Sequence, residues 1–132
     1  MCYYLLYFGI ARSPFSSEDF NSLLEQARSR NETLHITGKL LYCEGTFIQL
    51  LEGDENAVAA VYHSISQDDR LIALKKITEG YAEKRYYQNW SMAFDQISLR
   101  EINKIEHCDH ANVASYIKSS SAIKLLKLLA KT

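Results

Sequence analysis

The sequence predicts an α+β fold: a ferredoxin-like βαββαββ sandwich with two helices on one face of the sheet and additional C-terminal helices. Three observations predict it. Aromatic and branched runs typical of strands alternate with two apolar stripes at helical spacing. The dipeptide Glu44-Gly45 lies between two apolar runs, where glycine can supply the positive φ of a two-residue hairpin. The chain has 132 residues, enough to bury one good core but hardly two.

The first predicted strand covers residues 2–10 and is apolar on both faces, so we expect both faces of the sheet to be at least partly covered. A helix follows it. Ser16 or Ser17 can cap its start, and Asn31 is a plausible stop residue. Its apolar stripe recurs at i, i+3, i+4 and i+7 and consists of Phe20, Leu23, Leu24 and Ala27.

The predicted hairpin comes next, with strands at residues 35–43 and 46–52. A two-residue loop would pair Tyr42 with Phe47 and Leu40 with Gln49. Gln49 is then a polar side chain on an apolar face, and a buried amide without partners costs about 1–3 kcal/mol. Something polar should therefore lie over the hairpin: another side chain, water or a ligand.

The second half repeats the pattern. Asp54 can cap a second helix, and a fourth strand is predicted from Leu71 to Tyr81. The stripe of the second helix consists of Val58, Val61, Tyr62 and Ile65. Alternation predicts a short fifth strand over residues 90–94, with Trp90, Met92 and Phe94 on one side.

The last forty residues differ in kind and look helical over 98–106 and, as one or two helices, over 113–131. The final segment is amphipathic and basic. It could lie on a membrane surface, but we expect it to cover the second face of the sheet or a partner subunit. We therefore expect a domain at residues 1–95 and a helical extension at 96–132.

Composition argues against several function classes. The net charge is -1 and dispersed, which does not suggest nucleic acid, and no run approaches the length of a membrane span. Cys2, Cys43 and Cys108 have no CxxC spacing, so reduced thiols in the cytoplasm are expected. The cluster at 107–110 lacks a second ligand pair for a metal. No P-loop, nucleophile elbow or isolated carboxylate pair indicates an enzyme.

What remains is a set of polar or distinctive residues within apolar segments: Tyr7, Asn31, Gln49, Trp90 and Met92. The first and third strands of this fold are neighbours, so Tyr7 could donate its hydroxyl to Gln49. The residues alone thus allow a small polar site between the two helices and the sheet, and they do not name its ligand.

At these residues the sequence resembles the BLUF family, the blue-light sensors that bind a flavin. The resemblance covers about residues 1–95 and rests on five motifs in order at family-like spacing. They are Tyr7-Phe8-Gly9-Ile10-Ala11, then Asn31 with Ile36-Thr37-Gly38-Lys39-Leu40-Leu41-Tyr42, Phe47-Ile48-Gln49-Leu50-Leu51-Glu52-Gly53, Asp68-Asp69-Arg70 and Trp90-Ser91-Met92.

The resemblance implies oxidised FAD held non-covalently, with its ring between the two helices above the sheet. The implied flavin-binding residues are Tyr7, Asn31, Gln49, Asp68, Arg70 and Met92. It further implies that light drives an electron and a proton from Tyr7 to the flavin, and that their return leaves Gln49 rotated or tautomerised. Trp90 and Met92 would carry this change toward the C-terminal helices.

Two positions depart from the family pattern. Gly9 replaces the usual serine, which bears on local hydration or the speed of dark recovery, and Leu71 stands where many relatives have histidine. We expect a short stand-alone photoreceptor, not an enzyme, whose output goes through a partner protein or a change of homo-oligomeric assembly. The alternative is a flavin-free ferredoxin-like module that binds a small ligand or a protein.

Overall fold

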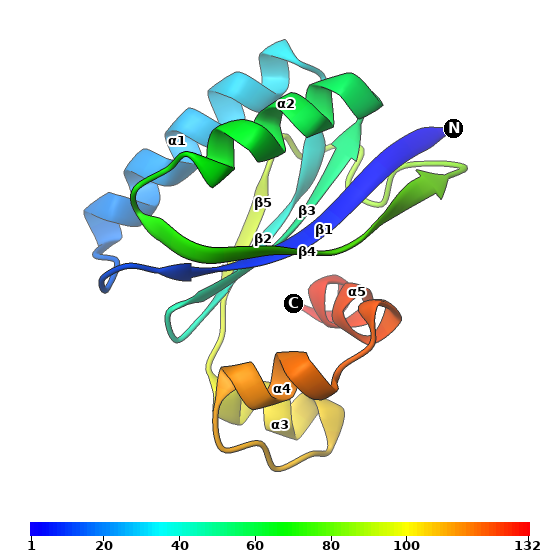
Figure 1. The fold of residues 1–132 in the computed structure, drawn as a ribbon. Coiled ribbons are helices and arrows are strands. Elements are labelled where there is room, and N and C mark those ends of the chain that lie inside the picture. Colours follow the sequence, from blue (N-terminus) through cyan, green and yellow to red (C-terminus); the bar gives the residue numbers. More distant parts are fainter.

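The structure is a computed structural model that describes residues 1–132 (Figure 1). Residues 1–96 contain five strands and two helices, and three helices follow. In chain order the elements are β1 (Cys2–Ala11), α1 (Ser17–Thr33), β2 (Thr37–Cys43), β3 (Thr46–Gly53), α2 (Glu55–Ser66), β4 (Leu71–Ala82), β5 (Ala93–Gln96), α3 (Leu99–Glu106), α4 (Val113–Ser119) and α5 (Ala122–Lys131).

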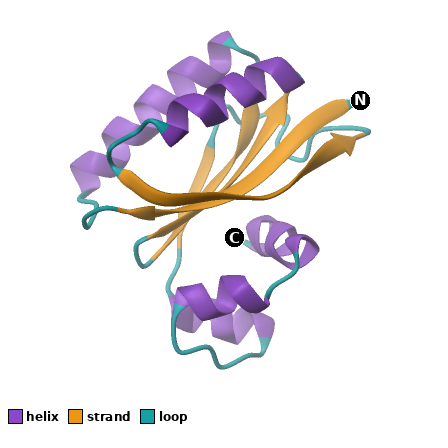
Figure 2. Ribbon diagram, in the orientation of Figure 1, coloured by secondary structure: helices purple, strands orange, loops and turns teal.

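The strands form one sheet in the order β4-β1-β3-β2-β5. All neighbours are antiparallel except β2 and β5, which are parallel. Helices α1 and α2 lie on one face of this sheet, and α3, α4 and α5 lie on the other (Figure 2). The predicted ferredoxin-like α+β sandwich with added C-terminal helices is therefore confirmed.

The hairpin has the predicted register, with Tyr42 opposite Phe47 and Leu40 opposite Gln49. Both loop residues have positive φ, 46° at Glu44 and 92° at Gly45, as a turn that matches the twist of the strands requires. On its other side β3 pairs with β1. This pairing confirms that the first and third strands are neighbours.

Two hydrophobic cores lie on opposite faces of the sheet. The core under α1 and α2 consists of Tyr3, Leu5, Tyr7, Phe20, Leu24, Ile36, Leu40, Tyr42, Phe47, Leu51, Val58, Val61 and Met92. The core under the C-terminal helices consists of Leu6, Leu41, Cys43, Ile48, Leu50, Ile97, Ile102, Val113, Tyr116, Leu125, Leu128 and Leu129. Strand alternation assigns neighbouring residues to different cores, which explains why the first strand is apolar on both faces.

The C-terminal helices pack on the sheet through their leucines. Leu125, Leu128 and Leu129 of α5 are almost completely buried. Lys39 on β2 donates from Nζ to the Leu129 carbonyl at 2.8 Å, at the end of α5 where carbonyls lack helical partners. The apolar face of α5 is therefore in contact with protein. None of the helices combines the length and the apolar character that crossing a membrane requires.

Three sequence predictions need correction. The length of the chain predicts hardly more than one core, but the sheet separates two cores on its opposite faces. Helix α1 continues to Thr33, so Asn31 lies inside its last turn and is not the stop residue. Strand β5 begins at Ala93, so Trp90 and Met92 do not share a strand face. Trp90 is 58% exposed and Met92 only 1%. The Trp90 N–H donates to the Tyr87 carbonyl, so Trp90 ends a turn and does not begin the strand.

Candidate functional site

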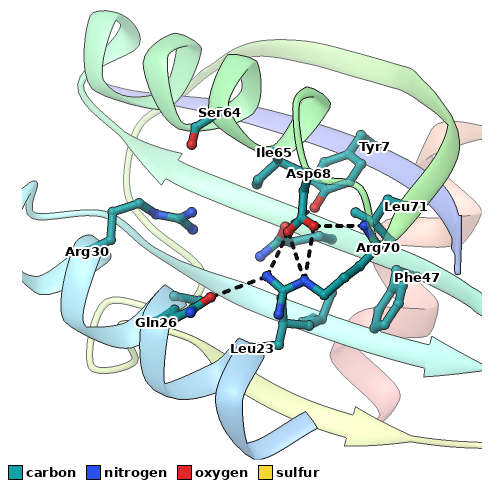
Figure 3. A pocket seen from close by; sticks show the side chains of 13 residues that line it. Tyr7, Leu23, Gln26, Arg30, Phe47, Ser64, Ile65, Asp68, Arg70 and Leu71 are labelled. Carbon is teal, nitrogen blue, oxygen red and sulfur yellow. Dashed lines mark hydrogen bonds and ion pairs between the residues drawn. The ribbon is translucent and has the colours of Figure 1, made fainter. Parts of the chain in front are cut away.

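A cavity of about 150 Å³ lies between α1, the end of α2 and the sheet (Figure 3). Helix α1 contributes one wall, the segment from α2 to the start of β4 contributes the opposite wall, and β1, β2 and β3 form the floor. The lining residues are Tyr7, Leu23, Gln26, Ala27, Arg30, Leu40, Phe47, Gln49, Ser64, Ile65, Asp68, Arg70 and Leu71. The sequence predicted a polar site at this place.

Tyr7 and Gln49 lie at the centre of the floor. They are directly opposite each other on β1 and β3, and both are almost fully buried. The Tyr7 hydroxyl donates to Gln49 Oε1, as predicted from strand order. Burial raises the pKa of Tyr7, so this phenol is neutral at ordinary pH.

Met92 is the second partner of Gln49. The amide Nε2 donates to Met92 Sδ at 3.3 Å, and Arg28 Nε donates to the Met92 carbonyl at 3.0 Å. The buried amide therefore uses both ends, one on a phenol and one on a thioether. Of Trp90 and Met92, only Met92 contacts Gln49, and the Trp90 side chain is largely exposed.

Asn31 is completely buried but does not line the cavity. Its Nδ2 donates to the Ser91 carbonyl at 2.7 Å, and its Oδ1 accepts from Arg30 Nε at 3.2 Å. Asn31 therefore joins the last turn of α1 to the residue before Met92.

Asp68 and Arg70 form an ion pair at the wall of the cavity opposite α1, with 2.7 Å between Arg70 Nη2 and Asp68 Oδ2. The side-chain hydrogen bonds from Arg70 lower the pKa of Asp68. Arg70 also donates to Gln26 Oε1 at 3.3 Å and so links the two walls (Figure 3).

Arg30 lines the cavity and was missed from the sequence. Burial lowers the pKa of its guanidinium, and it makes no ion pair, since the two ion pairs are Arg70–Asp68 and Lys76–Glu79. Arg30 belongs to a polar run at the end of a helix, a composition typical of an exposed surface. The spacing could have indicated its position, because Leu23, Ala27 and Arg30 follow at i, i+4 and i+7 and so lie on one face of the helix.

The two departures from the family pattern have a structural counterpart. A Cβ built on Gly9 would lie 2.9 Å from Leu74 Cδ1, so the Leu74 side chain occupies the space that a serine at position 9 would need. Leu71 is part of the cavity lining. In this chain leucines of β4 therefore fill positions beside the site that polar side chains would otherwise occupy.

The comparison with family models decides the assignment. Residues 2–93 match the family described as BLUF, sensors of blue light using FAD. The chain belongs to the BLUF family. Its fold, its function class as a blue-light sensor and its cofactor FAD follow from that membership.

Relatives among BLUF proteins agree. The chain is 34% identical over 89 residues to photoactivated adenylate cyclase subunit beta-like protein FB of Euglena gracilis, a match over 67% of this chain and 10% of that protein. The solved structure of BlrB, a BLUF protein in the dark state, is 28% identical with a TM-score of 0.70, over 78% of this chain and 76% of that one. BlsA in its ground state has the same fold, with 22% identity and a TM-score of 0.85 over 99% and 87% of the chains.

Proposed function

We propose that this chain senses blue light through FAD bound in the cavity between α1 and α2, with Tyr7 and Gln49 as the photoactive pair. The observation that supports this most directly is their hydrogen bond on the floor of that cavity. The bound flavin supplies a ring that absorbs blue light and accepts an electron.

The residues of the cavity fit a flavin ring. Apolar side chains from both walls can contact the faces of a flat aromatic system, and polar groups gather where its hydrogen-bonding edge would lie. That edge needs both donors and acceptors, and the side chains of Gln49, Asp68, Arg70 and Arg30 supply both kinds. The cavity is smaller than those that enclose whole drug-sized ligands, about 300–1,000 Å³. The rest of the dinucleotide would thus extend outside it.

Gln49 can act as a switch because of its two partners. In the structure its amide donates to Met92 and accepts from Tyr7. A thioether sulfur accepts hydrogen bonds but does not donate them. Reversal of the amide would turn Oε1 toward Met92 and would therefore break this contact. The change would release the residue that leads into β5.

We propose that residues 1–95 form the sensing unit and residues 96–132 the output unit, and that the chain acts on a partner protein or by a change of assembly, with a homo-oligomer as the expected state. Asn31 would approach the flavin from the last turn of α1, and Trp90 would respond to the release of Met92. We propose that the chain is a sensor and not itself an enzyme, because its sequence has no P-loop, nucleophile elbow or isolated carboxylate pair. A cytoplasmic location fits its three unpaired thiols.

An absorption spectrum before and after blue illumination tests this proposal. The purified protein should be yellow, shift slightly to the red under blue light and revert in the dark. Tyr7→Phe should retain FAD and lose the shift, because the phenol that gives up the electron and proton is gone. A normal reversible shift in this variant would contradict the mechanism. A colourless protein that takes up no FAD would favour the flavin-free binding module instead.

A further inference from the structure

A second, exposed site lies on the opposite face of the sheet, between α5 and the loop that joins β4 to β5. A cleft of about 220 Å³ opens there, lined by Leu50, Tyr86, Tyr87, Ile123, Leu126, Lys127 and Ala130. We call these residues the α5–loop surface. Tyr86 is 72% exposed and Ile123 is 66% exposed, although both are large apolar side chains. Such side chains gathered around a cleft are typical of interaction sites.

Helix α5, which forms one wall of this cleft, is basic. It contains three lysines and no aspartate or glutamate, while the whole chain has a net charge of -1. Lys127 lines the cleft and is not part of either ion pair in the structure. Lys127 thus gives the apolar cleft a positive rim, which is complementary to a partner with an acidic residue beside an apolar one.

A lipid surface fits this site less well than a protein segment. The leucines that make α5 amphipathic are buried against the sheet, so they are not free to enter a bilayer. The outward stripe of α5 consists of Ile123, Lys127 and Ala130, which is too narrow for a membrane-bound face but suits a short peptide.

The same loop is anchored at a buried carboxylate. Glu52 is 1% exposed and accepts hydrogen bonds from the backbone N–H of Tyr86 at 2.6 Å and of Tyr87 at 3.1 Å. The hydroxyl of Thr37 donates to it as well, at 3.0 Å. Glu52 lies three residues after Gln49 on β3. The loop then runs on to Met92, which contacts Gln49, so the cleft and the cavity are joined by one short segment.

We propose that the α5–loop surface is the binding site for the partner of this sensor, and that the partner presents an acidic segment whose large apolar side chain enters the cleft. This inference rests on the proposed function only for its light dependence. Release of Met92 shifts the loop that carries Tyr86 and thereby changes the shape of the cleft.

Site-specific photocrosslinking tests the surface directly. In cells of the source organism, the FAD-bound full chain carries benzoylphenylalanine in place of Tyr86. The control carries it in place of Gln67, an exposed residue at the end of α2 on the other face of the sheet. We expect a crosslink from position 86 and not from 67, and mass spectrometry should map it to a segment rich in aspartate or glutamate that includes a large apolar residue. A crosslink to lipid, to a second copy of the chain or to a neutral or basic segment overturns the proposal, as does no crosslink above the control.

Two variants, each with one lysine replaced by glutamate, test the role of charge by their crosslink yields. Lys127→Glu should reduce the crosslink yield about tenfold, since it replaces an attraction with a repulsion. Lys104→Glu on α3, which is also exposed but lies outside the cleft, should leave the yield unchanged. Equal yields in the two variants overturn the role of the positive rim.

The flavin spectrum and a light-insensitive variant separate this inference from the proposed function. Both lysine variants should keep the red shift of the flavin absorption, because neither residue lines the cavity. The near-ultraviolet light that activates benzoylphenylalanine also excites a flavin, so Tyr7→Phe serves as the unswitched reference in place of a dark sample. A wild type that crosslinks without any spectral shift would overturn the photoreceptor proposal and support the surface. A wild type that shifts but crosslinks no more than Tyr7→Phe would overturn the link through the loop.

Discussion

The two faces of the sheet are built from the same strands and differ in the side chains at their centres. On the face of α1 and α2, Gln49 and Tyr7 lie under a cavity with polar walls. On the face of the C-terminal helices, Ile48, Leu50 and Leu128 lie in an apolar core and have almost no exposed surface. Alternation along β3 separates the two by one residue. The polar pair and the apolar core therefore give the two faces different roles, sensing on one and stability on the other.

The largest expected effect is a complete loss of signal on the cavity face. Gln49→Leu has nearly the same size but cannot donate to Met92 or accept from Tyr7, so we expect FAD binding without a light-induced red shift. Difference spectra under blue light check this. A variant that shifted like the wild type would show that the amide is not the switch.

Truncation of a side chain in the core under the C-terminal helices should cost the most stability. Leu128→Ala removes a fully buried side chain, and we expect the free energy of unfolding to fall by about 2–5 kcal/mol. Leu23→Ala, a half-buried side chain beside the cavity, should cost clearly less because the site is already incompletely packed. Urea unfolding of the purified variants compares them, and equal losses would contradict the division between the faces.

The smallest effect concerns Lys39, a buried cation on the face of the C-terminal helices. Burial lowers the pKa of Lys39, so the unfolded chain binds more protons than the folded one between this lowered pKa and the ordinary value of about 10.4. Stability from this group therefore rises with pH across that window. The difference in unfolding free energy between wild type and Lys39→Met should move in favour of the wild type as pH increases. A difference that does not change with pH would contradict this.

The sequence was sufficient where local rules decide the structure. Glu44-Gly45 fixes the hairpin, the hairpin fixes which residue faces Gln49, and strand order then places Tyr7 beside it. It was insufficient where distant contacts decide. Trp90 and Met92 alternate like strand residues, but the Trp90 N–H donates to the Tyr87 carbonyl in a turn, and the strand begins only at Ala93.

The burial of Arg30 and Asn31 could not be predicted for a related reason. Both lie in a run of polar residues at the end of α1, which by composition belongs on the surface. The partner of the Asn31 amide is the Ser91 carbonyl, 60 residues away in the sequence, and Arg30 lines a cavity whose other walls come from later parts of the chain. Individual roles in binding the flavin therefore remain predictions from the family resemblance.

The anchor at Glu52 has a consequence for how such a sensor can diversify. It captures two main-chain N–H groups, which every residue other than proline provides, so the identities at positions 86 and 87 are not constrained by the anchor itself. The exposed side chain of Tyr86 can therefore change while the backbone of the loop stays anchored at Glu52. Substitutions at the exposed loop position could therefore create binding sites for new partner proteins and leave the photochemistry in the cavity unchanged.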